Sequence, residues 1–178
     1  KEGRALLNAA DKPVVWADPG HPRNREQLAA YAAALAARAG VAGVHLDYIR
    51  FPHEQTSMGA RDRAVFERWL GTKANRWPAD VEFKGPLRKQ YYAWRASQVE
   101  GAVEAVAAAV RRARPGTTLS AAVYGKHPSC VNAVGQDWPR WVARGLVDHV
   151  APMNYTGDLG VFETLLREQV AKAPRERI

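Results

Sequence analysis

The run at residues 41–52 constrains the fold of this chain more than any other stretch, because apolar and ionisable residues alternate along it. Side chains two positions apart on a strand share a face, so His45 and Asp47 would point one way while Val44 points the other. A strand with an ionisable pair at its carboxyl end is typical of parallel α/β barrels and open sheets, where active sites collect at that end. We therefore expect Asp47 to be a functional carboxylate, rather than one that caps the next loop or pairs with Arg50.

Apolar runs and helical periodicity alternate along the rest of the chain. Such alternation implies right-handed crossovers and a parallel sheet. An eight-unit barrel needs about 250 residues, so we expect an α/β fold, a partial TIM-type (β/α) barrel of about four to five βα units. Residues 1–12 are expected to be irregular apart from a turn near residues 8–11. The expected strands are 13–17, 41–52, 117–124 and 146–155, and the expected helices are 25–39, 59–70, 87–114, 138–144 and 159–173; residues 126–136 read as a loop, and 174–178 could start another strand.

The connection at about residues 53–86 is much longer than the roughly 2–6 residues of an ordinary βα loop. Long insertions at the carboxyl end of a parallel strand commonly form binding walls or lids. We therefore expect residues 1–178 to form a single barrel domain or a fragment of one, with this insertion beside its mouth.

Composition limits the class of protein. The chain has 178 residues, 47% of them hydrophobic and 25% charged, which suits one globular domain. It contains neither an apolar signal segment nor a run of about 18 apolar residues that would span a membrane. We therefore expect a soluble protein, and the absence of a leading methionine suggests the interior of a longer chain.

The net charge of +8 raises the question of nucleic-acid binding. Basic residues in such proteins cluster on one face or interleave with exposed aromatic residues. Here they are dispersed, and the densest group, at residues 111–114, falls where a helix dipole favours cations. No nucleic-acid partner is expected. Cys130 is the only cysteine, so neither an internal disulfide nor a cysteine metal cluster can form.

Motif analysis removes several enzyme classes. The chain lacks a Gly-rich dinucleotide or P-loop motif and a Gly-x-Ser-x-Gly elbow. The five histidines show no close metal spacing, so neither a metal nor another cofactor is expected. His45, Asp47 and His127 could nevertheless converge in space, which keeps a metal-dependent hydrolase as an alternative.

What remains is a group of polar and aromatic residues at or just beyond the ends of the expected strands. In a parallel barrel these residues would meet around one mouth. Aromatic rings stack on sugars while carboxylates do acid, base or nucleophile work, so the group favours a carbohydrate site. Each residue alone also has a plain structural explanation, such as a core tyrosine or a turn asparagine. The group contains Asp47, Asp137 and Asp158 as candidate catalytic residues, and His21, His45, Arg50, Tyr124, His127, Trp138, Asn154 and Tyr155 as candidate substrate-binding residues.

The segment VAGVHLDYIRFP at 41–52 resembles the DGIHFDYIRYP strand of the glycosyl hydrolase-like family 10, bacterial proteins with a (β/α)₈ barrel. Further motifs similar to that family follow in order: WADPGHPRNR (16–25), WR (94–95), RPG (114–116), LSAAV (119–123), GQDW (135–138), WV (141–142) and PMNYT (152–156). The resemblance covers about residues 13–160. It implies that Asp47 ends the fourth barrel strand and Asn154–Tyr155 the sixth, and that the protein is secreted or periplasmic. Ala42 departs from the acidic residue common there.

A more distant similarity connects these strands to family 18 chitinases, whose fourth strand ends in a D-x-D-x-D-x-E pattern. Aligning Asp47 with the last aspartate of that pattern places Ile49 where the catalytic acid would be. The chitinase mechanism is therefore not expected.

Together the residues and the resemblance imply a glycoside hydrolase acting on a bacterial or environmental polysaccharide. Asp47 would be the general acid or nucleophile, with His45 or Arg50 setting its ionisation. Asn154 and Tyr155 would orient Asp47 or the substrate, and the second carboxylate would be Asp137, Asp158 or a residue outside this chain. A non-catalytic carbohydrate-binding barrel is the alternative from another class. The oligomeric state, the sugar and the linkage stay undetermined.

Overall fold

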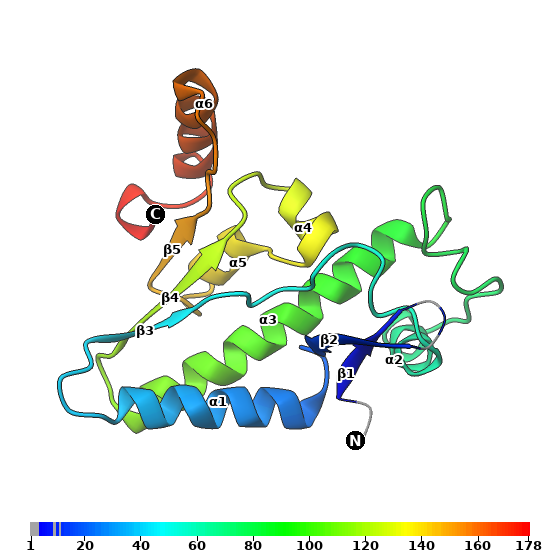
Figure 1. The fold of residues 1–178 in the computed structure, drawn as a ribbon, viewed down its shortest axis with the longest axis horizontal. Helices are drawn as coiled ribbons and strands as arrows, with labels where there is room; N and C mark the ends of the chain where they lie inside the picture. The colour runs from blue at the N-terminus through cyan, green and yellow to red at the C-terminus, as the bar shows by residue number, and fades with distance from the viewer. Residues whose placement is uncertain (1–3, 9, 11) are drawn as a thin grey trace.

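A three-stranded parallel sheet, covered on one face by two helices, organises the fold (Figure 1). The computed structural model describes residues 4–8, 10 and 12–178. In the described part of the chain, neither edge strand of this sheet has a further partner strand. The strands lie in the order β3 (Gly43–Leu46), β4 (Thr118–Val123) and β5 (His149–Pro152), and a separate two-stranded sheet pairs β1 (Ala5–Leu7) with β2 (Pro13–Ala17).

The two faces of the parallel sheet differ in chemistry. Val44 and Leu46 of β3 are buried against the helices, whereas His45 between them is exposed on the other face. The register pairs His45 with Ser120 of β4 and Ser120 with His149 of β5. One polar row therefore crosses all three strands on the face that the helices leave uncovered.

Helices α1 (Pro22–Ala36) and α3 (Arg88–Ala113) lie side by side beneath the sheet (Figure 1). The helix expected over residues 87–114 is confirmed, and a stripe of valines at 3.6-residue spacing on α3 is fully buried in the core. On α1 the inward positions are alanines, Ala32 and Ala36, and small side chains let the two helix backbones approach closely. The stripe on α3 consists of Val99, Val103, Val106 and Val110.

The long connection between β3 and α3 has a core of its own. It contains α2 (Ala60–Leu70), whose Phe66 packs edge-on against Tyr91 of α3 with ring centroids 5.4 Å apart. Arg95, fully buried on α3, donates to the carbonyls of His53 and Asn132 over 2.6 and 3.1 Å. This guanidinium attaches the first residues of the insertion to the main body of the fold.

The expectation that residues 13–17 open the parallel sheet is wrong. They form β2, which pairs antiparallel with β1, a strand in a region expected to be irregular. β1 is only three residues long and buries Leu6 alone, so its periodicity is too short to detect. Asn8 Oδ1 accepts from the backbone N–H groups of Ala10 and Lys12, both over 3.0 Å, and residues 9 and 11 of the expected turn lie outside the described residues.

Several boundaries also differ from expectation. Helix α1 begins at Pro22 rather than 25, because His21 Nδ1 caps it by accepting from the N–H of Arg23. Asn24, which directly precedes the expected start of this helix, lies within it and donates from its side chain to the carbonyl of Asp18. The expected loop 126–136 contains a helix, and the last residues form a 3₁₀ turn instead of a strand. The remaining elements are α4 (Ser129–Val134), α5 (Trp138–Ala143), α6 (Leu159–Val170) and η1 (Arg175–Arg177).

Within the described residues, no helix has both the length and the apolar character needed to cross a membrane.

We predict that Glu67→Gln flattens the acid limb of the stability curve. The hydrogen bond from Arg63, helped by the N–H of Ala74 and by Lys73, lowers the pKa of Glu67 from 4.5 to about 2. Because the folded state binds this proton more weakly than the unfolded state, the stabilisation is complete above pH 4.5 and is lost as the pH falls toward 2. Urea unfolding measured between about pH 2 and 6 should show a smaller loss in the variant.

The matched control for this prediction is Glu163→Gln. Glu163 forms an exposed i,i+4 pair with Arg167 on α6, and such pairs contribute little to stability. The control should therefore follow the wild-type pH dependence. Parallel stability curves for wild type and Glu67→Gln would contradict the prediction.

Candidate active site at the carboxyl edge of the parallel sheet

The carboxyl ends of the three parallel strands bring several expected site residues to one edge of the sheet. Asp47 directly follows β3, Tyr124 follows β4, and residues 153–155 follow β5. Parallel pairing in register guarantees that these ends lie together.

A tight turn after β3 exposes two consecutive side chains. Tyr48 adopts a left-handed conformation with φ 55°, which is uncommon for a residue other than glycine. Asp47 Oδ1 accepts from the Tyr48 N–H over 2.7 Å, and the Arg50 N–H donates to the Tyr48 carbonyl over 2.8 Å. As a result Asp47 and Tyr48 are both exposed and Ile49 is buried, so the strict alternation of the strand ends here.

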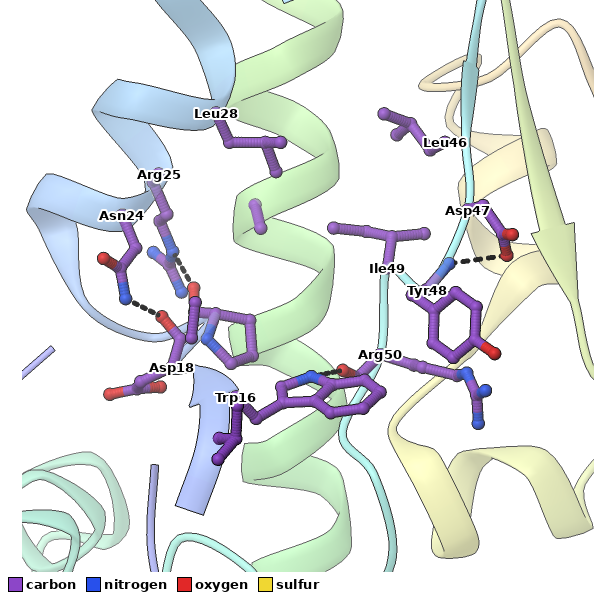
Figure 2. A pocket seen from close by; sticks show the side chains of 14 residues that line it. Trp16, Asp18, Asn24, Arg25, Leu28, Leu46, Asp47, Tyr48, Ile49 and Arg50 are labelled. Atoms are coloured by element: carbon purple, nitrogen blue, oxygen red, sulfur yellow. Dashed lines mark hydrogen bonds between the residues drawn. The ribbon is translucent and has the colours of Figure 1, made fainter. Parts of the chain in front are cut away.

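Arg50 lies between two tyrosine rings. Its Cζ atom is 4.7 Å from the ring centroid of Tyr48 and 4.6 Å from that of Tyr124, and its Nη1 donates to Tyr124 Oη over 2.6 Å. Trp16 at the end of β2 donates from Nε1 to the Arg50 carbonyl over 3.0 Å and contacts the Tyr48 ring (Figure 2). The site therefore has a cation flanked by two tyrosine rings, and a tryptophan from a third segment bonds to the backbone of the same arginine.

A buried amide holds the ends of β3 and β4 together. Gln136, fully buried, accepts from the N–H of Tyr124 over 2.9 Å. Its Nε2 donates to the carbonyls of Ala122 and Ile49 over 3.1 and 3.4 Å. One side chain thus satisfies backbone groups on both strand ends and fixes the spacing of Arg50 and Tyr124.

A cavity of about 480 Å³ adjoins this arrangement, between the end of β2, helix α1 and the turn after β3. That volume falls within the range of about 300–1,000 Å³ found for small-molecule sites. Asp47 and Tyr48 border it on the side of β4, while Asp18 and Arg25 border it on the opposite side (Figure 2).

The charged groups on the Asp18 side of the cavity are already bonded to other protein groups. Asp18 accepts from the Gly20 N–H over 2.7 Å and pairs with Arg61 over 3.1 Å. Burial nevertheless raises the pKa of the Asp18 carboxyl above its ordinary value, against the effect of those partners. Arg25 donates to the carbonyls of Pro19 and Gln98 over 2.7 and 2.9 Å. These groups shape the cavity wall through bonds they have already made.

The expected histidines do not gather around Asp47. His21 caps α1, and His45 Nδ1 lies 2.8 Å from Ser120 Oγ. His127 Nε2 lies 3.2 Å from Asp137 Oδ1. In the described part of the chain, His45, Asp47 and His127 do not form a metal-ligand cluster.

Of the remaining expected site residues, one is exposed and two are hydrogen-bonded within the fold. Tyr155 is 89% exposed, whereas Asn154 exchanges two side-chain hydrogen bonds with Gln169 of α6, over 3.1 and 2.8 Å. Asp158 caps α6 by accepting from the Val161 N–H.

The expectation that Trp138 binds substrate is wrong. Its side chain is 0% exposed and belongs to the main core, so no ligand can reach it. Trp141, one turn further along the short helix α5, is also fully buried. The face of α5 that carries both tryptophans therefore packs against the core.

Two residues that border the site were missed, Trp16 and Tyr48. Trp16 lies on the expected strand 13–17, and its position next to the Asp-Pro-Gly turn is the signal that could have placed it at the site. Strand alternation would place Tyr48 on the same apolar face as Val44, and no residue type marks the left-handed turn that overrides that alternation.

The fold is mixed α/β, and polar and aromatic residues gather at the carboxyl edge of its parallel sheet, where α/β proteins commonly bind their ligands. Comparison then identifies the family: a model of "Glycosyl hydrolase-like 10" matches residues 1–176, and the chain belongs to that family.

Among solved structures, the chain is similar to the PgaB (BpsB) glycoside hydrolase domain from Bordetella bronchiseptica, with a TM-score of 0.71 and 17% sequence identity. The likeness covers 98% of this chain and 52% of that one, so the chain spans about half the length of the structure it matches. At this identity the likeness shows the fold. Among curated proteins, none matches this sequence.

We predict that Gln136→Leu destabilises the fold and loosens the site. The change removes the acceptor for Tyr124 and the donor for Ala122 and Ile49, and each buried group left unpaired costs about 1–3 kcal/mol. Urea unfolding should show a lower midpoint than in the wild type. Gln90→Leu, on the exposed surface of α3, is the matched control and should leave the midpoint nearly unchanged; equal midpoints for both variants would contradict the prediction.

Proposed function

We propose that this protein is a glycoside hydrolase acting on a bacterial or environmental polysaccharide, with Asp47 as its central carboxylate. The observation that carries the proposal is the position of Asp47, exposed at the carboxyl end of a parallel strand in a chain of a glycosyl hydrolase-like family. The resemblance to a glycoside hydrolase domain in fold supports the same reaction class. A secreted or periplasmic location suits such a substrate.

We further propose that residues 1–178 are part of one (β/α)₈ barrel, with β3, β4 and β5 as neighbouring barrel strands. Both edges of this sheet are open in the described part of the chain, and its polar face is uncovered. The chain corresponds to about half of the matched hydrolase domain, which supports a closed barrel built with further strands.

The chemical role of Asp47 follows from its surroundings. Oδ1 accepts from the Tyr48 N–H, whereas Oδ2 has no hydrogen bond among the described residues and is available to act on a glycosidic bond. As a nucleophile Asp47 would attack the anomeric carbon, and as a general acid it would protonate the leaving oxygen. Tyr48 and Tyr124 offer ring faces on which a sugar could stack.

Hydrolysis normally needs a second carboxylate about 5–5.5 Å away for retention or about 6.5–9.5 Å away for inversion. Asp137 is engaged with His127 and Asp158 caps α6, and none of their contacts in the described part of the chain reaches Asp47. We therefore propose that the second carboxylate comes from outside residues 1–178.

The test is Asp47→Asn in the full-length protein, assayed for reducing ends on a panel of polysaccharides. Loss of an acid, base or nucleophile should lower turnover by about 100-fold or more while the fold is kept. Asp148→Asn, at the opposite end of the sheet where Asp148 accepts from the Leu119 N–H, is the matched control and should keep its turnover. Turnover like that of the wild type in Asp47→Asn would remove Asp47 from the mechanism.

A carbohydrate-binding protein without turnover is the second candidate. It is favoured by the engagement of Asp137 and Asp158 away from Asp47. Binding of an oligosaccharide, followed by tryptophan fluorescence, with no hydrolysis by the full-length wild type would select this function over the first.

A further inference from the structure

We propose that Arg50 makes the site selective for sugars that carry a carboxylate, that is, for polysaccharides containing uronic-acid residues. This inference rests on the proposed function, because it names the substrate class of the same site. It is argued from the state of the Arg50 side chain, the cavity beside it and the charge of the whole chain.

Arg50 is a cation without an acidic partner among the described residues. Its only side-chain hydrogen bond there goes to the neutral hydroxyl of Tyr124, and the nearest carboxylate in sequence, Asp47, accepts instead from a backbone N–H. Some arginines are paired with acids, such as Arg63 with Glu67 over 2.8 Å and Arg144 with Glu100 over 2.7 Å, whereas the buried Arg95 donates to backbone carbonyls. The site therefore retains an uncompensated positive charge at its rim.

The guanidinium is held in place although it is not neutralised. Two tyrosine rings flank it at 4.7 and 4.6 Å, and Trp16 binds the Arg50 carbonyl. Cation–π contacts offset part of the cost of confining the charge. A confined arginine loses little further freedom when a ligand binds, so its fork of donors is preorganised for a planar acceptor.

Donor capacity is left over on this side chain. Nη1 is the only guanidinium nitrogen of Arg50 with an acceptor among the described residues, whereas Nε is buried and Nη2 is not among the buried unpaired atoms. A carboxylate accepts from two parallel N–H groups of one guanidinium, so it matches the outer edge of Arg50, which consists of Nη2 and the second N–H of Nη1.

The position of Arg50 connects this recognition to the chemistry. Arg50, Tyr48 and Asp47 extend to the same side of the cavity, away from Asp18 (Figure 2). Arg61 and the Gly20 N–H already offset the charge of Asp18, so Asp18 competes little with an anionic ligand for the guanidinium of Arg50. A sugar whose carboxylate binds Arg50 would therefore lie beside Asp47.

The charge of the chain supports the same substrate class independently. The net charge is +8, with 26 basic and 18 acidic residues. A basic surface attracts a polyanion over long distances and raises its association rate, and this attraction falls with ionic strength. A neutral or cationic polysaccharide would gain nothing from it.

The experiment compares uronic-acid oligosaccharides with their carboxyl-reduced forms, which keep the same sugar ring, linkage and length without the charge. Oligomers of galacturonate, mannuronate and glucuronate, each with its reduced counterpart, are titrated calorimetrically into the full-length protein. Wild type should bind at least one acidic oligomer about 10- to 100-fold more tightly than its reduced form, the size expected for a charge-assisted pair.

Arg50→Gln should abolish that preference and leave the affinity for the reduced oligomer nearly unchanged. Arg112→Gln, an exposed position at the end of α3, changes the net charge equally and should keep the preference. If Arg50→Gln does not fold, as judged by circular dichroism, Arg50→Lys decides. It keeps the charge but loses the planar fork, so its preference should fall below that of the wild type.

Equal binding of acidic and reduced oligomers by the wild type would overturn the inference. So would a preference that the Arg50 variants retain, because the general charge of the chain would then explain it. Hydrolysis is measured on the same panel to separate the two proposals. Turnover of reduced oligomers without any acidic preference defeats the Arg50 inference alone, whereas Arg50-dependent binding with no turnover of any oligomer defeats the hydrolase proposal alone.

Discussion

The buried amide of Gln136 is the interaction on which the site most depends. Where β3 and β4 end, their ladder hydrogen bonds stop, and the backbone groups just beyond need other partners. Gln136 supplies them for Tyr124, Ala122 and Ile49 at once. Two chain segments far apart in sequence are thereby held at a fixed separation. The contact between Arg50 and Tyr124 exists because of that separation, so a core hydrogen-bond network determines the geometry of the surface site.

Arginines in this molecule have two kinds of neighbour: some are paired with carboxylates, whereas Arg50 at the site is flanked by aromatic rings. Glu67, Glu100 and Asp18 are each paired with one or more arginines or lysines, which offsets part of the cost of removing these carboxylates from water. Arg50 has aromatic rings in place of an acid. The same residue type therefore serves stability at the first set of positions and remains available for binding at the last. The difference lies in the neighbours that the fold supplies.

Regular periodicity explains how much of the fold could be predicted. The valine stripe of α3, the bounds of α2 and the central parallel strands follow from patterns with periods of 3.6 and 2. The short elements β1 and α4 could not be predicted, because they contain too few residues to show a hydrophobic period. Trp138 was misjudged for a related reason. The position of Trp138 after an expected strand suggested a binding residue. The orientation of the short helix α5, however, is decided by the core against which it packs.

The sequence by itself determined the family, the parallel sheet and the placement of Asp47 at a strand end, because these depend on local pattern and on motifs close together in the chain. The tertiary structure alone decided that β2 belongs to a hairpin, that Tyr48 turns outward beside Asp47, and that Arg50 lies between two tyrosine rings. These features arise from contacts across many residues, such as the 74-residue separation of Arg50 and Tyr124. No local pattern encodes which distant side chain will satisfy a given donor, since that choice is made by packing and by the requirement that buried polar groups find partners.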